Sequence, residues 1–361
     1  MSKKNGTKDI GVAKKLLEES ISGLNKQFGT GAVGFLKDDA KFENIDVIST
    51  GSLKIDYMTG IKGIPCGRIT EIYGHEGSGK TTLALSIVAE AQKAGHSCLY
   101  IDMEHALNPK YAQQLGVDAN SLLISQPDSA EQAFEIAEKM IRSCTLGLIV
   151  IDSVAALVPQ VELDMKFSEN LMAGQARLMS MGLRRLAPVI NQCKCAVVFI
   201  NQIRQKVGVM FGSNETTSGG VALRFYASVR IEVHKRGLIK DGLNVIGQDL
   251  SVKIVKNKFA SPYVSDLVQL IYGKGFDRYS EMFDLGVKFE FFDKKGSWYA
   301  LTDGTMVGQG KEACVTKISN DMSLERKLLD FIESKVTVNL EAAFSDDNII
   351  PDDSSGAAAA A

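Results

Sequence analysis

One glycine-rich segment decides the fold, and it reads Gly74-His75-Glu76-Gly77-Ser78-Gly79-Lys80-Thr81, followed by Thr82. The segment matches the pattern G-x-x-x-x-G-K-[ST], which forms a phosphate-binding loop when it lies between a strand and a helix. Its glycines let backbone N–H groups and the N-terminus of the next helix face phosphate oxygens. The Lys80 ammonium would neutralise the β and γ oxygens, and the Thr81 hydroxyl would coordinate Mg²⁺. The segment therefore predicts binding of ATP with Mg²⁺.

Strand-like and helical patterns alternate around this loop, which is typical of a parallel sheet covered by helices. The predicted strands are 68–73, 98–103, 147–151 and 196–201, and the predicted helices are 81–94, 130–141 and 174–190. Residues 148–151 are apolar without alternation, as expected for a strand buried on both faces. Two further predicted strands, 229–233 and 250–256, have hairpin-like spacing and indicate an antiparallel edge. We predict an α/β fold with a mostly parallel central sheet flanked by helices.

Four segments are predicted along the chain. Residues 1–40 contain an amphipathic helix at 10–28 and a short strand-like run, an arm whose apolar face would bury against the core or a neighbouring subunit. Residues 41–276 form the core. Residues 277–336 change in character, with a β-like stretch at 298–299 and a helix at 323–334, and predict a small α+β domain. Residues 337–361 are acidic, lack Lys and Arg, and predict a disordered tail.

Composition limits the classes of function. The 361 residues include 41 basic and 43 acidic side chains, with a formal net charge of −2, so binding to DNA would have to rest on local basic loops. The six cysteines form no CxxC pair and no apolar leader is visible, which indicates a reduced, cytoplasmic chain. Cys193 and Cys195 are interpreted as packing residues. No apolar run approaches the roughly 20 residues that span a bilayer, which excludes a membrane-spanning protein.

Polar side chains end three of the predicted strands. Asp152 follows 148–151 and is the expected carboxylate on the metal side, the alternative being a helix N-cap. Glu104 lies just beyond the strand 98–103 and is the candidate base for the attacking water, with a surface or N-cap carboxylate as the alternative. Gln202 follows the strand 196–201, and its amide is expected to touch the γ-phosphate.

A long loop, 203–220, follows Gln202 and is unusual for an α/β connection. It contains Arg204, Lys206, Phe211 and several glycines, a mixture that suits binding to a phosphodiester backbone and spacing of bases. If Gln202 senses the γ-phosphate, the nucleotide state would reorder this loop.

Five stretches together resemble the bacterial RecA recombinase family in order and spacing over about residues 10–335. They are 74–82, Ile101-Asp102-Met103-Glu104-His105-Ala106-Leu107, Val150-Ile151-Asp152-Ser153-Val154-Ala155-Ala156-Leu157, Phe199-Ile200-Asn201-Gln202-Ile203-Arg204 and Gly208-Val209-Met210-Phe211-Gly212. The stretches 48–52 and 255–258 also match. The resemblance implies a RecA-like P-loop core and a DNA-dependent ATPase. Such a protein forms a helical filament on single-stranded DNA, pairs it with double-stranded DNA, exchanges strands in recombinational repair and activates SOS repressor cleavage.

The resemblance also implies residue roles and partners. Glu104, Lys80 and Gln202 would be catalytic, while Thr81 and Asp152 would hold Mg²⁺. Three residues are implied near the adenine, namely Tyr111, Asn108 and Tyr272. Two lysines, Lys256 and Lys258, are implied to reach the ATP of the adjoining subunit. The residues implied at DNA, in or beside loops 162–174 and 203–220, are Arg177, Arg204, Lys206, Gly219, Gly220, Arg230 and Met172. A LexA-like repressor and recombination mediators are implied as protein partners.

Some positions depart from the family pattern. Residues 165–170 lack the usual glycines of the first DNA loop, which implies a stiffer loop. His75 and Gly77 replace more usual residues of the phosphate loop, at positions where the motif demands no single side chain. Asn108 stands where an aspartate is common. Two alternatives remain, a RecA-fold hexameric DNA helicase and an ATP-gated regulatory DNA-binding scaffold.

Overall fold

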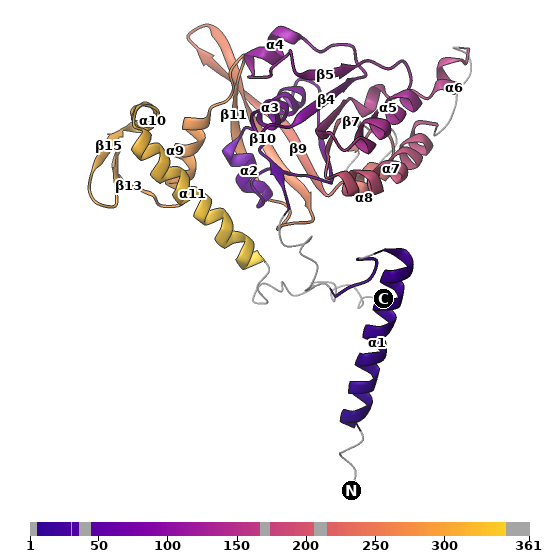
Figure 1. Ribbon diagram of the computed structural model, residues 1–361. Helices are drawn as coiled ribbons and strands as arrows, with labels where there is room; N and C mark the ends of the chain where they lie inside the picture. The colour runs from indigo at the N-terminus through magenta and orange to yellow at the C-terminus, as the bar shows by residue number, and fades with distance from the viewer. Residues whose placement is uncertain (1–5, 30, 36–44, 167–173, 206–214, 344–361) are drawn as a thin grey trace, which may run out of the picture. The chain divides into compact units, whose positions relative to one another are not determined.

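The structure of the chain is a computed structural model, which describes residues 6–29, 31–35, 45–166, 174–205 and 215–343 (Figure 1). The chain divides into two compact units, 1–46 and 47–361. The first unit contains α1 (Gly6–Phe28), the predicted amphipathic helix. Its apolar side chains Val12, Leu16 and Leu17 are at least half exposed. None of the described helices is long and apolar enough to cross a membrane.

The predicted strand after α1 is not observed in the described residues that follow this helix, 29 and 31–35. Instead the Asn25 side chain binds the backbone of Val33, its Nδ2 donating to the carbonyl at 2.9 Å and its Oδ1 accepting from the amide at 3.0 Å. These two bonds fold the chain back as a turn, and Gly29 and Gly31 have the positive φ that turns favour. Residues 36–44, in the rest of the predicted arm, lie outside the described residues.

The second unit is built on a large mixed sheet, as predicted. Its strand order is β12-β11-β10-β9-β3-β7-β6-β4-β5, with β8 pairing to β7. The parallel part contains β3 (Ile69–Gly74), β4 (Ser97–Asp102), β5 (Leu122–Ser125), β6 (Leu146–Asp152) and β7 (Ala196–Gln205), and β9 (Val229–Asp241) joins it beside β3. Every residue of β6 except Gly147 is buried, which explains its uninterrupted apolar sequence.

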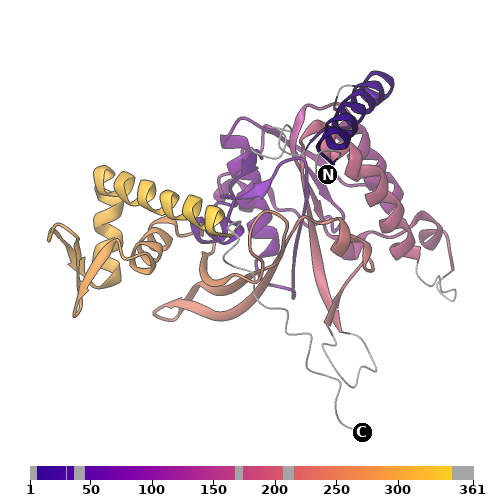
Figure 2. The same cartoon turned by 90° about the horizontal axis from the view of Figure 1, so that it is seen from below.

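Helices cover both faces of this sheet (Figure 2). On one face α3 (Lys80–Lys93) packs on β3, β4, β6 and β7, within a core that includes Leu83, Ile87 and Tyr100. On the other face α5 (Ala130–Arg142) and α7 (Gly174–Cys193) pack on each other, and the Phe134 ring fits against Gly182, where a Cβ would come within 2.6 Å of it. The carboxyl ends of the central strands therefore meet the N-terminus of α3.

Shorter elements connect these layers. They are β1 (Val47–Ile48), α2 (Leu53–Thr59), β2 (Ile64–Pro65), α4 (Pro109–Gln114), the 3₁₀ helix η3 (Val154–Ala156), α6 (Gln160–Leu163), β8 (Glu215–Thr217) and α8 (Ala222–Tyr226). β1 and β2 form a separate two-stranded sheet.

The antiparallel edge is longer than the sequence patterns predict. β9 pairs with β10 (Asn244–Asn257), which pairs with β11 (Ser265–Ile271) and then β12 (Gly275–Phe276). β9 and β10 meet at a tight turn with Gly242 at φ +58°. The outer half of the hairpin is largely exposed, and its apolar residues, such as Leu238, Val245 and Ile246, do not alternate regularly with polar ones, so hydrophobic periodicity does not mark it as strand.

A small C-terminal part has a three-stranded antiparallel sheet, β13 (Phe292–Lys295), β14 (Trp298–Leu301) and β15 (Met306–Gln309), with its own core. Helices α9 (Arg278–Lys288), α10 (Gly310–Asn320) and α11 (Met322–Ala343) pack with it. The helix predicted to end at Ser334 continues to Ala343, because no glycine or proline interrupts 322–343. It therefore enters the predicted acidic tail, whose remainder, 344–361, lies outside the described residues.

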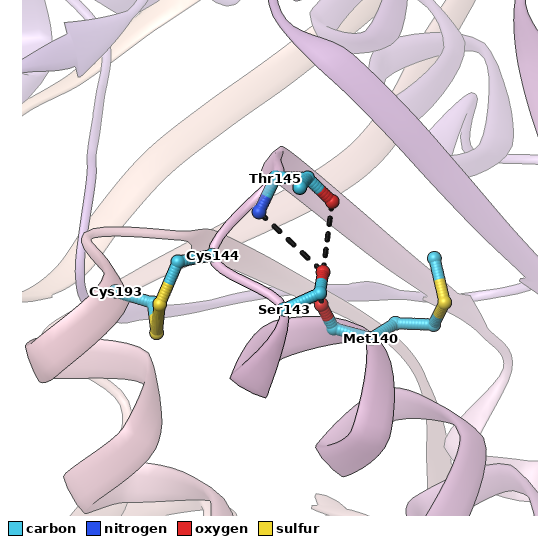
Figure 3. The surroundings of a disulfide bond; sticks show 5 residues. All are labelled: Met140, Ser143, Cys144, Thr145 and Cys193. Carbon is cyan, nitrogen blue, oxygen red and sulfur yellow. Dashed lines mark hydrogen bonds between the residues drawn. A yellow bond between two sulfur atoms is a disulfide. The ribbon is translucent and has the colours of Figure 1, made fainter.

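The prediction that the cysteines are all reduced is wrong for one pair, because Cys144 and Cys193 form a disulfide across 49 residues of sequence (Figure 3). Packing of α5 on α7 brings their C-terminal ends together, with the two Cα atoms 5.0 Å apart, within the usual range for a disulfide. The Ser143 hydroxyl donates to the Met140 carbonyl at 2.6 Å and organises the turn that carries Cys144. Cys195 is a free, buried packing residue.

Candidate active site

The phosphate loop joins β3 to α3. A Cβ on Gly74 would lie 2.1 Å from the Val233 carbonyl oxygen, so only glycine permits this approach of β3 to β9. Gly77 and Gly79 have φ of +68° and +83°, the left-handed conformation that glycine adopts without strain. The Lys80 Nζ donates to the His75 carbonyl at 2.7 Å across the loop, and burial lowers the pKa of Lys80.

Asp152 lies at the end of β6 beside the first turn of α3. Its Oδ2 accepts hydrogen bonds from the Thr81 hydroxyl at 3.0 Å and from the Tyr100 hydroxyl at 2.6 Å. Burial raises the pKa of Asp152, and these two hydrogen bonds oppose that rise. Burial and the neighbouring Asp152 charge raise the pKa of Tyr100 well above its usual value, so the phenol is a donor at every physiological pH.

Glu104 lies just beyond β4, and its side chain is exposed. Its Oε1 accepts hydrogen bonds from the Ser153 hydroxyl and from the Gln202 Nε2, the latter at 3.1 Å. The loop carrying Glu104 is held by Asp102, whose carboxylate accepts from the amides of Ala106 and Leu107. Glu104 is thus oriented by two fixed donors while it stays open to water.

Gln202 connects this carboxylate to the second predicted DNA loop. Its backbone carbonyl accepts from the Ser218 amide at 3.3 Å, and β7 and β8 pair from Ile203–Thr217 to Gln205–Glu215. Asn201, next to it, is buried and donates to Glu71 and to the Ser218 carbonyl. The Gln202 side chain therefore lies at the base of the hairpin that flanks residues 206–214.

The side chains around the loop fit a triphosphate and a divalent cation. The Ser78 hydroxyl oxygen is buried and has no hydrogen-bond partner within the described ranges, and a Cβ on Gly77 would meet nothing within 4 Å. A hydroxyl and a carboxylate, from Thr81 and Asp152, are oxygen groups of the type that Mg²⁺ prefers.

Two aromatic residues expected near adenine lie at the edge of the same loop. The Tyr111 hydroxyl is 2.8 Å from the Thr82 hydroxyl. The Asn108 side chain caps α4 by accepting from the Lys110 and Tyr111 amides at 3.0 and 3.3 Å. Tyr272 is connected more loosely, its hydroxyl 3.4 Å from a Gln248 oxygen, while the Gln248 amide donates to the Gly77 carbonyl.

Lys256 and Lys258 are not brought to the phosphate loop of their own chain. The Lys256 Nζ donates to the carbonyls of Arg224 and Phe225 at 2.7 and 3.0 Å, at the end of α8. Burial and the nearby Lys258 lower the pKa of Lys256, and Lys258 is exposed.

The expected DNA residues fall into different environments. Arg177 and Arg204 are exposed. Gly219 and Gly220 both have φ of +78°, and a Cβ on either would lie within 2.8 Å of Val154 or Ala176 side-chain atoms, so both are required by packing. Lys206 and Met172 lie outside the described residues.

The Arg230 side chain is largely buried against the neighbouring strand β3. It is 9% exposed, its Nε donates to Glu71 at 2.5 Å, and its guanidinium lies over the Tyr73 ring at 4.5 Å. In this conformation the side chain contacts Glu71 and Tyr73 of β3, so it supports the strand pair β3–β9.

Two side chains that the sequence patterns do not identify contact the central carboxylates. Ser153 binds Glu104, and Tyr100 binds Asp152. Ser153 directly follows Asp152 in the motif, yet the pattern assigns it no role. Tyr100 is a hydroxyl-bearing residue in a buried apolar strand, and a buried Tyr hydroxyl usually needs a partner, which is the available clue.

Family models match nearly the whole chain. The RecA N-terminal domain matches residues 15–277 and the RecA C-terminal domain matches 280–341. Protein RecA of Pseudomonas fluorescens (strain Pf0-1) is 48% identical over 323 residues, covering 90% of this chain and 91% of that protein. Protein RecA of Chloroherpeton thalassium is 48% identical over 335 residues, covering 92% and 93%. Protein RecA of Francisella philomiragia is 52% identical over 298 residues, covering 82% of each. The chain therefore belongs to the RecA family of DNA-dependent ATPases, recombinases of DNA repair that bind DNA and form filaments.

Proposed function

We propose that this chain hydrolyses ATP with Glu104 as the general base and couples hydrolysis to DNA through Gln202. The observation that carries the proposal is the pair of hydrogen bonds that Glu104 Oε1 accepts from Ser153 and Gln202. A carboxylate held by two donors and open to solvent suits the positioning and deprotonation of an attacking water.

The phosphate loop supplies binding in this proposal. The backbone N–H groups of residues 74–79 and the Lys80 ammonium would hold the β and γ phosphates, and the N-terminus of α3 would add its partial positive charge. Thr81 and Asp152 are the proposed Mg²⁺ residues. When bound, the ion neutralises phosphate charge in the transition state. Tyr111, Asn108 and Tyr272 are the proposed neighbours of adenine.

Gln202 is the proposed link to DNA. Contact of its amide with a γ-phosphate would compete with its hydrogen bond to Glu104, and its backbone lies at the base of the β7–β8 hairpin. The nucleotide state would thereby bias the segment 203–220. Arg177 and Arg204, with their exposed guanidinium groups, are the DNA contacts best supported by the described residues, and Lys206 and Met172 are also proposed contacts. For Arg230 we propose a structural role.

Assembly would complete the site. Lys256 and Lys258 do not contact the phosphate loop of their own chain, and they are proposed to reach the ATP of an adjoining subunit. Phe225, whose carbonyl binds Lys256, is 72% exposed, as expected for a residue at a subunit interface. The exposed apolar face of α1 is the proposed docking element of the arm.

Protein partners and the cellular location are proposed from family membership. They are a LexA-like repressor whose cleavage the filament would assist, recombination mediators, and a cytoplasmic setting. The segment boundaries 1–40, 41–276, 277–336 and 337–361 are proposed with them.

Electron microscopy of the full chain on single-stranded DNA with Mg²⁺ and a slowly hydrolysed ATP analogue tests this function. We expect continuous helical filaments, followed by homologous strand exchange when ATP and duplex are added. Closed rings would support the helicase instead. Filaments without strand exchange would support the regulatory scaffold.

A further inference from the structure

Packing alone does not explain why residue 100 is a tyrosine. Tyr100 lies in the middle of β4 and is 1% exposed, among the apolar side chains between the sheet and α3. A phenylalanine would fill the same volume without a polar atom. The hydroxyl instead has one short hydrogen bond, 2.6 Å to Asp152 Oδ2, to which it donates.

Strand register explains how Tyr100 reaches this carboxylate. β4 and β6 are parallel, with Tyr100 paired to Val150 and Asp102 paired to Asp152. Tyr100 and Asp152 are therefore diagonal neighbours, a separation that long aromatic side chains can cross. The phenol spans that distance and brings a donor to the carboxylate from inside the core.

The hydrogen bonds to Asp152 are divided unequally between its two oxygens. Oδ2 accepts both the Tyr100 hydroxyl and the Thr81 hydroxyl, at 2.6 and 3.0 Å. Oδ1 accepts no side-chain donor within the described ranges. Two donors on one oxygen fix the rotation of the carboxylate and leave the other oxygen available to a ligand.

We propose that Tyr100 is a positioning residue for the Mg²⁺ side of the nucleotide site, acting by holding Asp152 through Oδ2 so that Oδ1 is presented to the ion or its water. The inference rests on the proposed function, in which Asp152 serves Mg²⁺. Hydrogen-bonded neighbours of metal-side carboxylates contribute to metal affinity because they remove the cost of orienting the ligand. Thr81 cannot replace Tyr100 in this role, since its hydroxyl is itself a proposed ligand of the ion.

The test is Tyr100→Phe in the full chain, with binding of a fluorescent ADP analogue measured across a Mg²⁺ titration and again in chelator. We expect the Mg²⁺ midpoint to rise about tenfold, at the lower end of the range for losing such a neighbour. Affinity in chelator should stay within about twofold, because the phosphate loop is intact. Tyr279→Phe, which removes a hydroxyl from the C-terminal core, is the matched control and should leave the midpoint unchanged.

Asp152→Asn separates this inference from the function on which it rests. If Asp152→Asn moves the Mg²⁺ midpoint and Tyr100→Phe does not, the role of Tyr100 is wrong and that of Asp152 stands. If neither moves it, the proposed metal side itself is wrong. Equal weakening of nucleotide binding by Tyr100→Phe with and without Mg²⁺ would show a packing effect and would also overturn the inference.

Discussion

The Gln202 amide lies 3.1 Å from the Glu104 carboxylate oxygen, joining the ends of two strands that β6 separates in the sheet. One residue is the candidate base and the other begins the hairpin around residues 206–214. A movement of either side chain therefore acts directly on the other through this hydrogen bond. Substituting each residue in turn separates the chemical role of Glu104 from the coupling role of Gln202.

Replacement of Glu104 with alanine should abolish turnover and spare binding. General bases contribute roughly 10²–10⁴-fold to rate, so kcat should fall by about that factor. ATP and single-stranded DNA affinities should remain within about threefold, because Glu104 is exposed and its loop is held by Asp102. Glu135→Ala, an exposed carboxylate on α5, is the control. Turnover at the wild-type rate in Glu104→Ala would remove Glu104 from the mechanism.

Replacement of Gln202 with alanine should uncouple DNA from hydrolysis. The variant keeps Lys80, Thr81 and Glu104, so ATP binding should persist, whereas the increase in ATPase rate on adding single-stranded DNA should be largely lost. The measurement compares kcat with and without DNA, with Gln113→Ala on α4 as the control. Full DNA stimulation in Gln202→Ala would contradict the coupling role.

Local patterns predict the central sheet because its strands are continuous and apolar, as in 148–151, and because the phosphate loop requires a strand before it and a helix after it. The same logic places Asp152, Glu104 and Gln202 at neighbouring strand ends. Side-chain pairing across the sheet is not predictable in this way. The burial of Arg230 depends on Glu71 in the adjacent strand, and the contact of Tyr100 with Asp152 depends on the register of β4 against β6.

Long-range helix packing is also beyond the sequence patterns. Nothing in the spacing of Cys144 and Cys193 marks them as partners, because their approach follows from α5 lying against α7 at Gly182 and Phe134. The outer part of the β9–β10 hairpin escapes prediction for the opposite reason, since it is largely exposed and its apolar residues, such as Leu238 and Val245, follow no regular alternation.

The disulfide predicts a thiol count. Unfolded under non-reducing conditions, the oxidised chain should show four reactive thiols, those of Cys66, Cys98, Cys195 and Cys314, and six after reduction. Closing a loop of 49 residues corresponds to about 4 kcal/mol in the chain-entropy model, so reduction should lower the urea midpoint clearly. Cys144→Ser should abolish the difference between oxidised and reduced protein, and Cys66→Ser should retain it. Six reactive thiols before reduction would show that the bridge does not form.

Glu281 predicts how stability depends on pH. It is 2% exposed on α9, and its Oε1 accepts from the Ser52 hydroxyl at 2.8 Å, connecting the C-terminal part to the cap of α2. Burial raises its pKa from 4.5 to about 7, against the opposing effects of Ser52 and Lys54. Because the folded-state pKa lies above the unfolded value, the folded state binds the proton more tightly. The stabilisation is complete below about pH 4.5 and is lost as pH rises through about 7.

Glu281→Gln should therefore flatten the fall in stability between about pH 4.5 and 7, since glutamine keeps an acceptor oxygen for Ser52 and cannot ionise. Each tenfold difference in proton affinity between the folded and unfolded chain, which is one pKa unit, changes the free energy of unfolding by about 1.4 kcal/mol. Asp56, whose pKa burial also raises to about 7, remains in the variant and contributes the same sign, so the slope should decrease without vanishing. Urea midpoints at several pH values, with Glu312→Gln on α10 as the exposed control, measure this. An unchanged slope in Glu281→Gln would mean that Glu281 titrates normally in the folded protein.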